Sequence, residues 1–403
     1  MDIFIYIFHI ISIILFAYLA FSGIYIFVFA FAGIFYKDPV NTSLDKRKIA
    51  VFIPGYKEDE VIVEVAEKAL EQSYPGELYK VIIIADSFQD RTLKALKELP
   101  VTVLEVSFEK STKAKALNAA LDYLPEDYQI AVVLDADNVM EYDFLEKLNH
   151  AFSEKTKVIQ GHRMAKNSNT NFAILDALSE EINNHIFRKG HRAVNLSSAI
   201  IGSGVGFDYQ LFKEYMKKAK AIGGFDKELE LNMLSDGHKI EYLNNARVYD
   251  EKIQSSNAFE GQRRRWLSAQ FIYFRRFSLQ GIKSALKFKN IDFIDKVIQM
   301  ILVPRILLIG LLIIVNLVSL LLNLTFNKVG NTLLMPNLSW WFILLIIVLL
   351  AFVISIPRSF YNSATLKALV SLPKGFWVMF LSLIKIKGAN KRFIHTSHGK
   401  IPK

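Results

Sequence analysis

The sequence predicts an α/β domain with a mostly parallel sheet, placed between hydrophobic segments that are long enough to cross a membrane. Two observations carry this prediction. Strand-like and helix-like stretches alternate from Ala50 to Asp135, as they do where helices connect parallel strands. Residues 3–36, 306–327 and 329–357 contain no Asp, Glu, Lys or Arg, and a transmembrane helix needs about 20 predominantly apolar residues.

The elements of the α/β domain follow from the spacing of apolar residues. Short β-branched runs predict strands, and apolar residues at every third or fourth position predict helices. The predicted strands are 50–54, 80–85, 101–106, 130–134 and 240–243, and the predicted helices are 60–72, 92–99 and 113–122. Ligands of parallel sheets bind where the carboxyl ends of the strands open into a crevice. Polar residues at those ends are therefore the first candidates for a functional site.

The uncharged N-terminal run predicts a retained transmembrane helix in residues 1–36. The alternative is a cleaved signal peptide, which has an apolar core of about 7–15 residues behind a positively charged start. The start Met1-Asp2 provides no positive side chain. We expect a soluble domain over 37–280 and, over 281–403, an interfacial helix, about two transmembrane helices and a basic tail.

Two C-terminal segments are expected to lie at the membrane surface. Residues 271–296 alternate aromatic, aliphatic and basic side chains, which is typical of an amphipathic interfacial helix. Residues 366–386 are apolar but are interrupted by Pro373-Lys374-Gly375. We expect this second segment to be interfacial or re-entrant rather than spanning.

Basic residues predict the orientation in the membrane. Lys37, Lys46, Arg47 and Lys48 follow the first hydrophobic run, and every charged residue from Arg358 onward is basic. Because Lys and Arg accumulate on the cytoplasmic face, we expect an integral protein of the cell (inner) membrane with a cytoplasmic catalytic domain. The net charge of +10 lies beside hydrophobic segments, which favours a lipid bilayer over nucleic acid as a partner. The absence of cysteine excludes disulfides and thiolate nucleophiles.

Two carboxylates follow the strand at 130–134, as Asp135-Ala136-Asp137. Carboxylate oxygens are ligands for hard cations such as Mg²⁺ or Mn²⁺, which proteins often hold with few carboxylates and with substrate phosphates. This pattern favours a metal-dependent enzyme that handles a nucleoside diphosphate. The alternative is a polar turn or helix cap at the strand end.

Three other residues extend the possible nucleotide site. Asp86 ends the strand at 80–85, where its carboxylate can accept hydrogen bonds from a base or ribose, or can cap the following turn. Lys113 and Lys115 lie two residues apart near a helix start. One of them can face a diphosphate while the other faces water, or both can belong to a solvated helix end.

Acidic residues and glycines follow in the second half of the domain. Asp226 is a candidate general base that would accept the proton of a sugar hydroxyl, and Glu228 would orient it or the acceptor. The alternative is that both acids complement the dipole at a helix start. Glycines at 202, 204 and 206 permit a close approach of backbone to ligand, but they also suit a bulge or a tight turn.

Gln262, Arg265 and Trp266 lie on nearby turns of a predicted helix. Arginine binds phosphate bidentately, and indole offers a flat apolar face to a sugar ring. The set therefore suits a departing nucleoside diphosphate and a stacked sugar. The alternative is that Arg263, Arg264 and Arg265 form a basic cluster that faces the membrane.

In this order, these motifs resemble the membrane-bound inverting glycosyltransferases of family 2, which include cellulose, chitin, hyaluronan and poly-N-acetylglucosamine synthases and ceramide glucosyltransferases. The resemblance covers about residues 50–276. The matching motifs are Ile53-Pro-Gly-Tyr-Lys-Glu58, Asp86, Lys115-Ala-Leu-Asn118, Asp135-Ala-Asp137, Phe225-Asp-Lys-Glu228 and Gln262-Arg-Arg-Arg-Trp266.

The resemblance implies a GT-A fold with a mixed, mostly parallel sheet, a nucleotide-sugar donor that is usually a UDP-sugar, and a divalent metal. By position, Asp86 would bind the nucleotide, Asp135 the uridine or diphosphate side, and Asp137 the metal together with Asp135. Asp226 would be the base. Gln262, Arg265 and Trp266 would hold the diphosphate and the acceptor end.

Three positions depart from the family pattern. Lys57 replaces a common Asn, Ala85-Asp86-Ser87-Phe88 replaces the usual Asp-Asp-Gly, and Phe225 replaces the Glu usual before the catalytic Asp. By the resemblance, the first two positions concern contacts with the nucleotide, and the third concerns the orientation of the acceptor.

The expected function is transfer of a sugar, with inversion, to a glycan or a lipid. The Gln-x-x-Arg-Trp motif favours a growing polysaccharide of the cell envelope, whereas about three spanning helices favour a non-processive enzyme that makes a glycolipid. A catalytically silent scaffold that binds a nucleotide sugar or a synthase partner is the alternative from another class.

Overall fold

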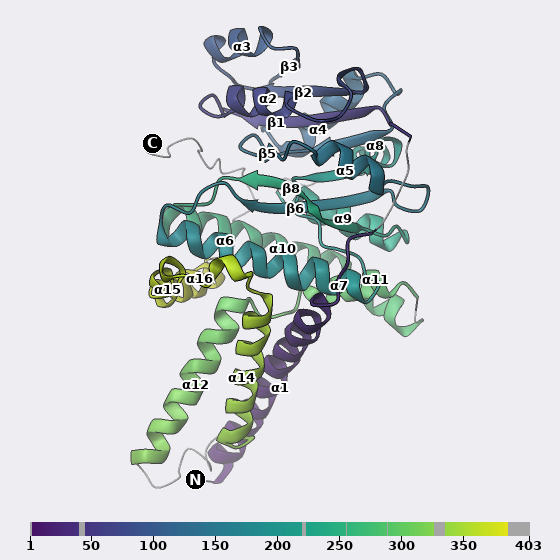
Figure 1. Cartoon of the computed structure of the whole chain (residues 1–403). Helices are drawn as coiled ribbons and strands as arrows, with labels where there is room; N and C mark the ends of the chain where they lie inside the picture. The colour runs from purple at the N-terminus through teal and green to yellow at the C-terminus, as the bar shows by residue number, and fades with distance from the viewer. Residues whose placement is uncertain are drawn as a thin grey trace.

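The computed structural model describes residues 2–39, 45–219, 223–254, 256–287, 289–325 and 335–385. It has an α/β domain at one end and a bundle of apolar helices at the other, with a layer of long helices between them (Figure 1). The predicted α/β class with flanking apolar helices is confirmed. The predicted span ends at 327 and 329 and the basic tail beyond 385 lie outside the described residues.

One eight-stranded sheet forms the centre of the α/β domain, in the order β3-β2-β1-β4-β7-β6-β8-β5. Parallel pairs join β3 to β2, β2 to β1, β1 to β4, and β6 to β8, whereas β7 runs antiparallel to both β4 and β6. The sheet is therefore mixed and mostly parallel, as expected. The strands are β1 (Ile49–Tyr56), β2 (Tyr79–Asp86), β3 (Thr102–Val106), β4 (Ile130–Val133), β5 (Val139–Met140), β6 (Val158–Ala165), β7 (Val205–Asp208) and β8 (Glu241–Asp250).

Alternating apolar residues of the strands build a core on each face of the sheet. In β1, Ala50 and Phe52 pack on the side of α4, α8 and α9, while Ile49 and Val51 pack on the side of α2, α3 and α5. The helices are α2 (Ile62–Leu70), α3 (Asp90–Lys97), α4 (Lys113–Tyr123), α5 (Phe144–Ala151), α8 (Tyr209–Lys218) and α9 (Phe225–Ser235). Burial on both faces explains the continuous β-branched runs of the central strands.

A layer of helices lies between the sheet and the apolar bundle (Figure 1). It contains α6 (Asn171–Asn183), its π-helical continuation η2 (Asn184–Gly190), α7 (His191–Ala193), α10 (Ser256–Leu286) and α11 (Ile291–Gln299). The amphipathic helix expected over 271–296 is thus divided: its first part continues α10 without a break at 280, and its second part is α11. The division falls at Asn290, which has a positive φ of 54° and whose side chain caps α11 at Phe293 N.

Three helices in the described part of the chain are long and apolar enough to cross a membrane. They are α1 (Asp2–Gly33), α12 (Arg305–Thr325) and α14 (Leu338–Ser355), and they pack together through residues such as Leu19, Leu312 and Leu344. The segment expected to be interfacial or re-entrant forms α15 (Ser363–Leu369) and α16 (Leu372–Ile384), which are bent by 46° relative to each other. Counting that bent pair, up to four spans are possible.

Candidate active site

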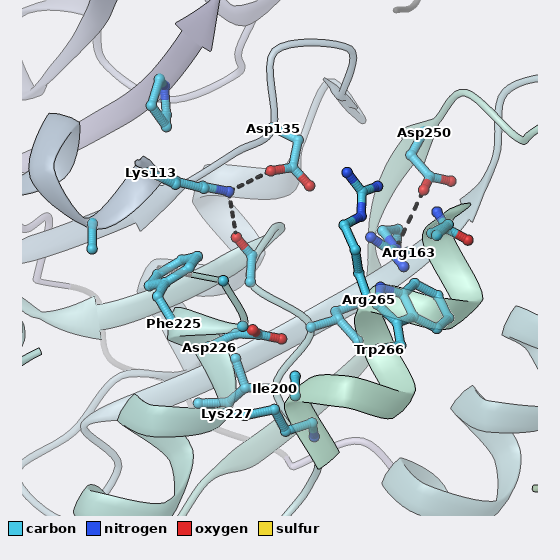
Figure 2. A pocket seen from close by; sticks show the side chains of 18 of the residues that line it. Lys113, Asp135, Arg163, Ile200, Phe225, Asp226, Lys227, Asp250, Arg265 and Trp266 are labelled. Carbon is cyan, nitrogen blue, oxygen red and sulfur yellow. Dashed lines mark hydrogen bonds and ion pairs between the residues drawn. The ribbon is translucent and has the colours of Figure 1, made fainter. Parts of the chain in front are cut away.

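A cavity of about 640 Å³ opens at the carboxyl ends of β1, β2 and β4 and extends toward α10 and α11. Its wall brings together seven of the predicted site residues from separate segments: Asp86, Asp135, Asp137, Asp226, Gln262, Arg265 and Trp266. Figure 2 shows Asp135, Asp226 and Arg265 around one shared space. Lys115 and Glu228, which the sequence also put forward, are not among the residues that line it.

The end of the cavity near β1 and β2 has a buried carboxylate. Asp86 is 2% exposed, and its Oδ1 accepts a hydrogen bond of 2.9 Å from Ser87 Oγ. The backbone carbonyl of Asp86 accepts from Lys57 N at 3.1 Å, which fixes the turn after β1 against the end of β2. Both Lys57 and Ser87 have positive φ, of 56° and 62°. The two departures from the family pattern therefore lie in one strained loop pair beside Asp86.

The two carboxylates after β4 have different surroundings. Asp137 is 7% exposed; its Oδ1 accepts from Asn138 Nδ2 and its Oδ2 from Glu251 N, each at 3.1 Å. Asp135 has a side chain that is 37% exposed and forms an ion pair with Lys113. Asp137 is thus held rigidly while Asp135 faces the open cavity.

Lys113 rather than Lys115 faces the cavity. Lys113 Nζ donates to Asp135 and, at 2.8 Å, to the backbone carbonyl of Gly202 (Figure 2). Lys115 Nζ instead donates to Lys110 O at 2.9 Å on the exposed side. Thr112 caps α4 by accepting from Lys115 N, so Lys113 is the first helical residue. Two residues turn a helix by about 200°, which points the two side chains apart. The sequence alone left this choice open, and the structure places Lys113, not Lys115, in the wall of the cavity.

Replacement of these two lysines should separate their roles. We expect Lys113→Met to lower kcat/KM for the sugar-nucleotide donor about tenfold or more, because a charge-assisted contact to the cavity is lost. Lys115→Met removes the same charge outside the cavity and should leave kcat/KM within about twofold of the wild type. Equal losses in the two variants would contradict the placement of Lys113.

Asp226 projects into the cavity from the first turn of α9. The helix begins after Gly224, which has a φ of +69°, and a Cβ added to Gly202 would lie 3.2 Å from Asp226 Cβ. The glycine at 202, which itself has a φ of +73°, therefore lets the chain after Ile200 pass close to the carboxylate. Burial raises the pKa of Asp226 above its usual range; Lys227 opposes this shift and Glu230 adds to it.

A raised pKa at Asp226 predicts an acid limb in the pH profile of catalysis. A general base acts only when it is deprotonated, so the rate should fall as the pH falls through the pKa of this carboxyl. The limb should lie above the ordinary aspartate value of about 3.9. The check is kcat/KM from pH 4 to 8; a rate that stays constant down to about pH 4 would be inconsistent with Asp226 as the base.

Glu228 lies behind the wall of the cavity. It is 1% exposed and forms an ion pair with Arg276, which joins α9 to the long helix α10. Glu228 is thus placed to hold the helix of Asp226 against the helix of Gln262, Arg265 and Trp266. Glu228 is therefore not placed to contact a substrate in the cavity.

Gln262, Arg265 and Trp266 lie on one side of α10, as the helical spacing predicts. Burial lowers the pKa of the Arg265 guanidinium, and Trp266 is 44% exposed at the rim. Gln262 Oε1 is buried without a hydrogen-bond partner among the described residues. Arg263 points elsewhere: it is 7% exposed, pairs with Asp176 and lies over the Trp266 ring at 4.4 Å. The alternative of a membrane-facing cluster therefore does not describe Arg263 or Arg265.

Sequence reasoning missed a buried ion network in the same wall. Arg163 Nη2 donates to Glu180 at 2.8 Å and its Nε lies 3.4 Å from Asp250, which also pairs with Lys252 at 2.6 Å. Burial raises the pKa of Asp250 to about 6; Lys252 and Arg163 oppose this shift, and Asp137 adds to it. No sequence motif marks these residues, because β6, α6 and the end of β8 are distant in sequence and come together only in the folded chain.

A family model described as "Glycosyltransferase like family 2" matches residues 46–269, which are more than half of this chain. The chain belongs to this family. All seven predicted site residues that line the cavity fall within the matched segment. The cavity therefore lies in the part of the chain that carries the family resemblance.

Relatives of this chain include two beta-monoglucosyldiacylglycerol synthases, from Trichormus variabilis and from a Nostoc species. Each is 25% identical over 232 residues, which cover 54% of this chain and 48% of the relative. The chain therefore spans about half the length of these relatives. A mannosyltransferase from Pyrobaculum calidifontis, solved in complex with GDP-Man and Mn²⁺, aligns over 95% of this chain and 99% of its own, with a TM-score of 0.56 and 15% identity. That likeness shows the GT-A fold.

The donor atoms around Asp135 and Asp137 fit a hard divalent cation. Both carboxylates line the cavity and all of their ligating atoms are oxygens. Among the described residues, no group of three or more His, Cys, Asp or Glu side chains is placed to hold a metal by itself. A cation here would therefore need additional oxygens, and Mg²⁺ sites commonly take them from substrate phosphates and water.

Proposed function

We propose that this chain is a glycosyltransferase that transfers a sugar from a nucleoside-diphosphate sugar to a membrane lipid. The first donor candidate is a UDP-sugar, and the transfer inverts the configuration of the anomeric carbon. The observation that carries the proposal is one cavity that holds a candidate base, two candidate metal ligands and a buried guanidinium. These groups come from β4, α9 and α10, which are distant in sequence. A scaffold without catalytic activity would only need to bind a nucleotide sugar, so it would not need a general base in the same cavity.

The proposed chemistry is a single displacement. Asp226 accepts the proton of the acceptor hydroxyl as the hydroxyl oxygen bonds to the anomeric carbon from the face opposite the diphosphate. The bond from that carbon to the diphosphate oxygen breaks, and its electron pair leaves with the diphosphate. Lys113 and Arg265 stabilise the negative charge that develops there. When bound by Asp135 and Asp137, Mg²⁺ or Mn²⁺ supplies further Lewis-acid stabilisation of the leaving group.

Two observations favour a lipid over a polysaccharide acceptor. The far end of the cavity includes Gln299 and Met300, only a few residues before the apolar helix α12 begins at Arg305. The described part of the chain has three candidate spans, or four with the bent pair, and these are few helices for a polymer channel. The similarity to enzymes named for a glucosyl diacylglycerol product supports the same choice. The Gln-x-x-Arg-Trp motif remains the argument for a polysaccharide, and the experiment below separates the two.

The membrane position is part of the proposal. Helices α1, α12 and α14 would span the bilayer, with the α/β domain on the cytoplasmic side, where Lys46, Arg47 and Lys48 follow α1. In Figure 1 the three helices project together from the same side of the domain. A nucleotide sugar from the cytoplasm and a lipid from the inner leaflet can then meet in one cavity.

The test is turnover by the detergent-purified full chain with UDP-glucose, UDP-galactose, UDP-N-acetylglucosamine and GDP-mannose, each with Mg²⁺ or Mn²⁺ and a lipid extract. We expect one donor to release its nucleoside diphosphate and to leave labelled sugar in the organic phase. Labelled sugar in a water-soluble polymer would indicate a polysaccharide synthase instead. If no donor released its nucleoside diphosphate, the catalytically silent scaffold would be favoured.

A further inference from the structure

The end of the cavity beyond Asp226 has a cationic wall that the donor chemistry does not use. Lys227 and Lys296 both line the cavity and share one carboxylate, Glu230, at 2.8 and 3.2 Å. Glu230 is fully buried and also accepts from Ile200 N at 2.9 Å. Its oxygens are thus committed to two ammonium groups and a backbone amide. The carboxylate does not line the cavity, whereas both lysines do.

Two of the countercharges at this end, Glu230 and Asp295, do not line the cavity. Lys296 also lies near Asp295, but Asp295 is not a lining residue and accepts hydrogen bonds from Tyr25 Oη and Gln299 Nε2, at 2.6 and 2.8 Å. The side chain of Lys227 is 36% exposed, and Lys227 is one of the lining residues. An ammonium carries three N–H donors, so this side chain has donors to offer a ligand beyond its contact with Glu230.

A third cation stands in the same wall. Arg188 is 1% exposed and lines the cavity; its Nη1 donates to Asn184 Oδ1 at 2.6 Å and lies 3.4 Å from Glu180. Glu180 also forms an ion pair with Arg163 at 2.8 Å. Glu180 and Glu230 are thus each shared between two cations. Burial lowers the pKa of Lys296, Glu230 opposes this shift and Lys227 adds to it, so an anion in the cavity would favour the charged ammonium.

This wall lies on the acceptor side of the base. In Figure 2, Asp226 lies between the Lys113–Asp135 pair and Lys227. Lys296 belongs to α11, which leads into the apolar helix α12, and the next turn is tied to α1, because Tyr18 Oη donates to Ile301 O at 2.6 Å. A molecule that enters from the membrane would therefore meet Lys296 and Lys227 before its hydroxyl reaches Asp226.

We propose that Lys227 and Lys296 bind the phosphate of an anionic acceptor lipid whose reacting hydroxyl lies a few bonds from that phosphate. The inference rests on the proposed function and narrows its substrate class. A phosphate presents several oxygens to clustered N–H donors, which suits two ammonium groups on one wall. Diacylglycerol, the lipid named in the product of the curated relatives, has no phosphate and would bring no anion to these two ammonium groups.

The experiment compares two acceptors with matched acyl chains, phosphatidylglycerol and diacylglycerol, presented to the full chain in mixed micelles with the active donor. The wild type should use phosphatidylglycerol with a kcat/KM at least about tenfold higher. Lys227→Gln should remove this preference mainly through the KM for phosphatidylglycerol, and Lys227→Arg should retain it. Donor binding, measured without acceptor, should be unchanged in Lys227→Gln, which reports an intact fold and donor site.

A matched control is Lys94→Gln, which removes the same charge from an exposed position in α3. This substitution should change kcat/KM for neither of the two lipid acceptors. Equal or better use of diacylglycerol by the wild type, or an equal loss with both lipids in Lys227→Gln, would overturn the inference while leaving lipid glycosylation in place. Glycerol 3-phosphate in a parallel arm tests the source of the phosphate: transfer to it and not to either lipid would support the cationic subsite but contradict the lipid acceptor of the proposed function.

Discussion

Asp226→Asn should lower kcat by about a thousandfold, because general-base catalysis contributes roughly 10²- to 10⁴-fold and an amide cannot accept the hydroxyl proton. The substitution keeps the size and most contacts of the side chain. It removes the carboxylate that α9 presents next to Gly202 in the cavity. Donor binding should change little, because the proposed contacts to the diphosphate are made by Lys113 and Arg265 and not by Asp226. Steady-state kinetics on the variant gives kcat, and a binding titration on the same protein gives the affinity for the donor.

A control for this substitution lies on the same helix. Asp236 caps the other end of α9, is exposed, and accepts a hydrogen bond of 2.6 Å from Tyr215 Oη outside the cavity. Asp236→Asn should keep kcat within about twofold of the wild type. If Asp226→Asn retained turnover, the base would have to be another group, and the proposed displacement would lose its proton acceptor.

Asp137→Ala should lower kcat/KM a hundredfold or more, because charge stabilisation by a bound cation is worth several kcal/mol. Asp137 is 7% exposed and is held at both oxygens by Asn138 and by the backbone of Glu251. Alanine removes the fixed ligand and leaves Asp135, which is ion-paired with Lys113. The loss should appear with both Mg²⁺ and Mn²⁺.

Metal titration checks the same residue without turnover. Since two carboxylates are a sparse ligand set, Mn²⁺ should bind the wild type weakly alone and more tightly when a nucleoside diphosphate is present. Asp137→Ala should remove this dependence, while Asp127→Ala, at an exposed position paired with Lys48, should preserve it. Tight binding of Mn²⁺ without nucleotide, unchanged in Asp137→Ala, would place the metal elsewhere.

The strands that are buried on both faces are the part of the fold that the sequence predicts most directly. Runs such as Ile130–Val133 and Val81–Ala85 have no polar face, so only a central strand accommodates them. Strand β6 (Val158–Ala165) escaped prediction because Gln160, His162 and Arg163 interrupt its apolar pattern. Gln160 and His162 are buried through hydrogen bonds to Ser203 O and to Glu181. Such partners are distant in sequence and cannot be read from spacing.

The same distinction applies to the candidate site. Residues at strand ends and in ordered motifs were found, because the topology of parallel sheets gathers them at one edge. The choice between Lys113 and Lys115 needed the helix start at Thr112, since a shift of two residues reverses the face. The cationic wall around Lys227 and Lys296 joins α9 to α11, and no local pattern links the two. Its residues became candidates only once the cavity was known.

The most direct test of the account is a structure of the full chain in lipid nanodiscs with UDP and Mn²⁺, because the central claim is that a nucleoside diphosphate binds where β4, α9 and α10 meet. We expect the diphosphate against Lys113 and Arg265, with the cation at Asp137 and the base Asp226 facing the space left for the sugar. Nucleotide bound outside this cavity, or bound without contact to any of these four residues, would contradict the account.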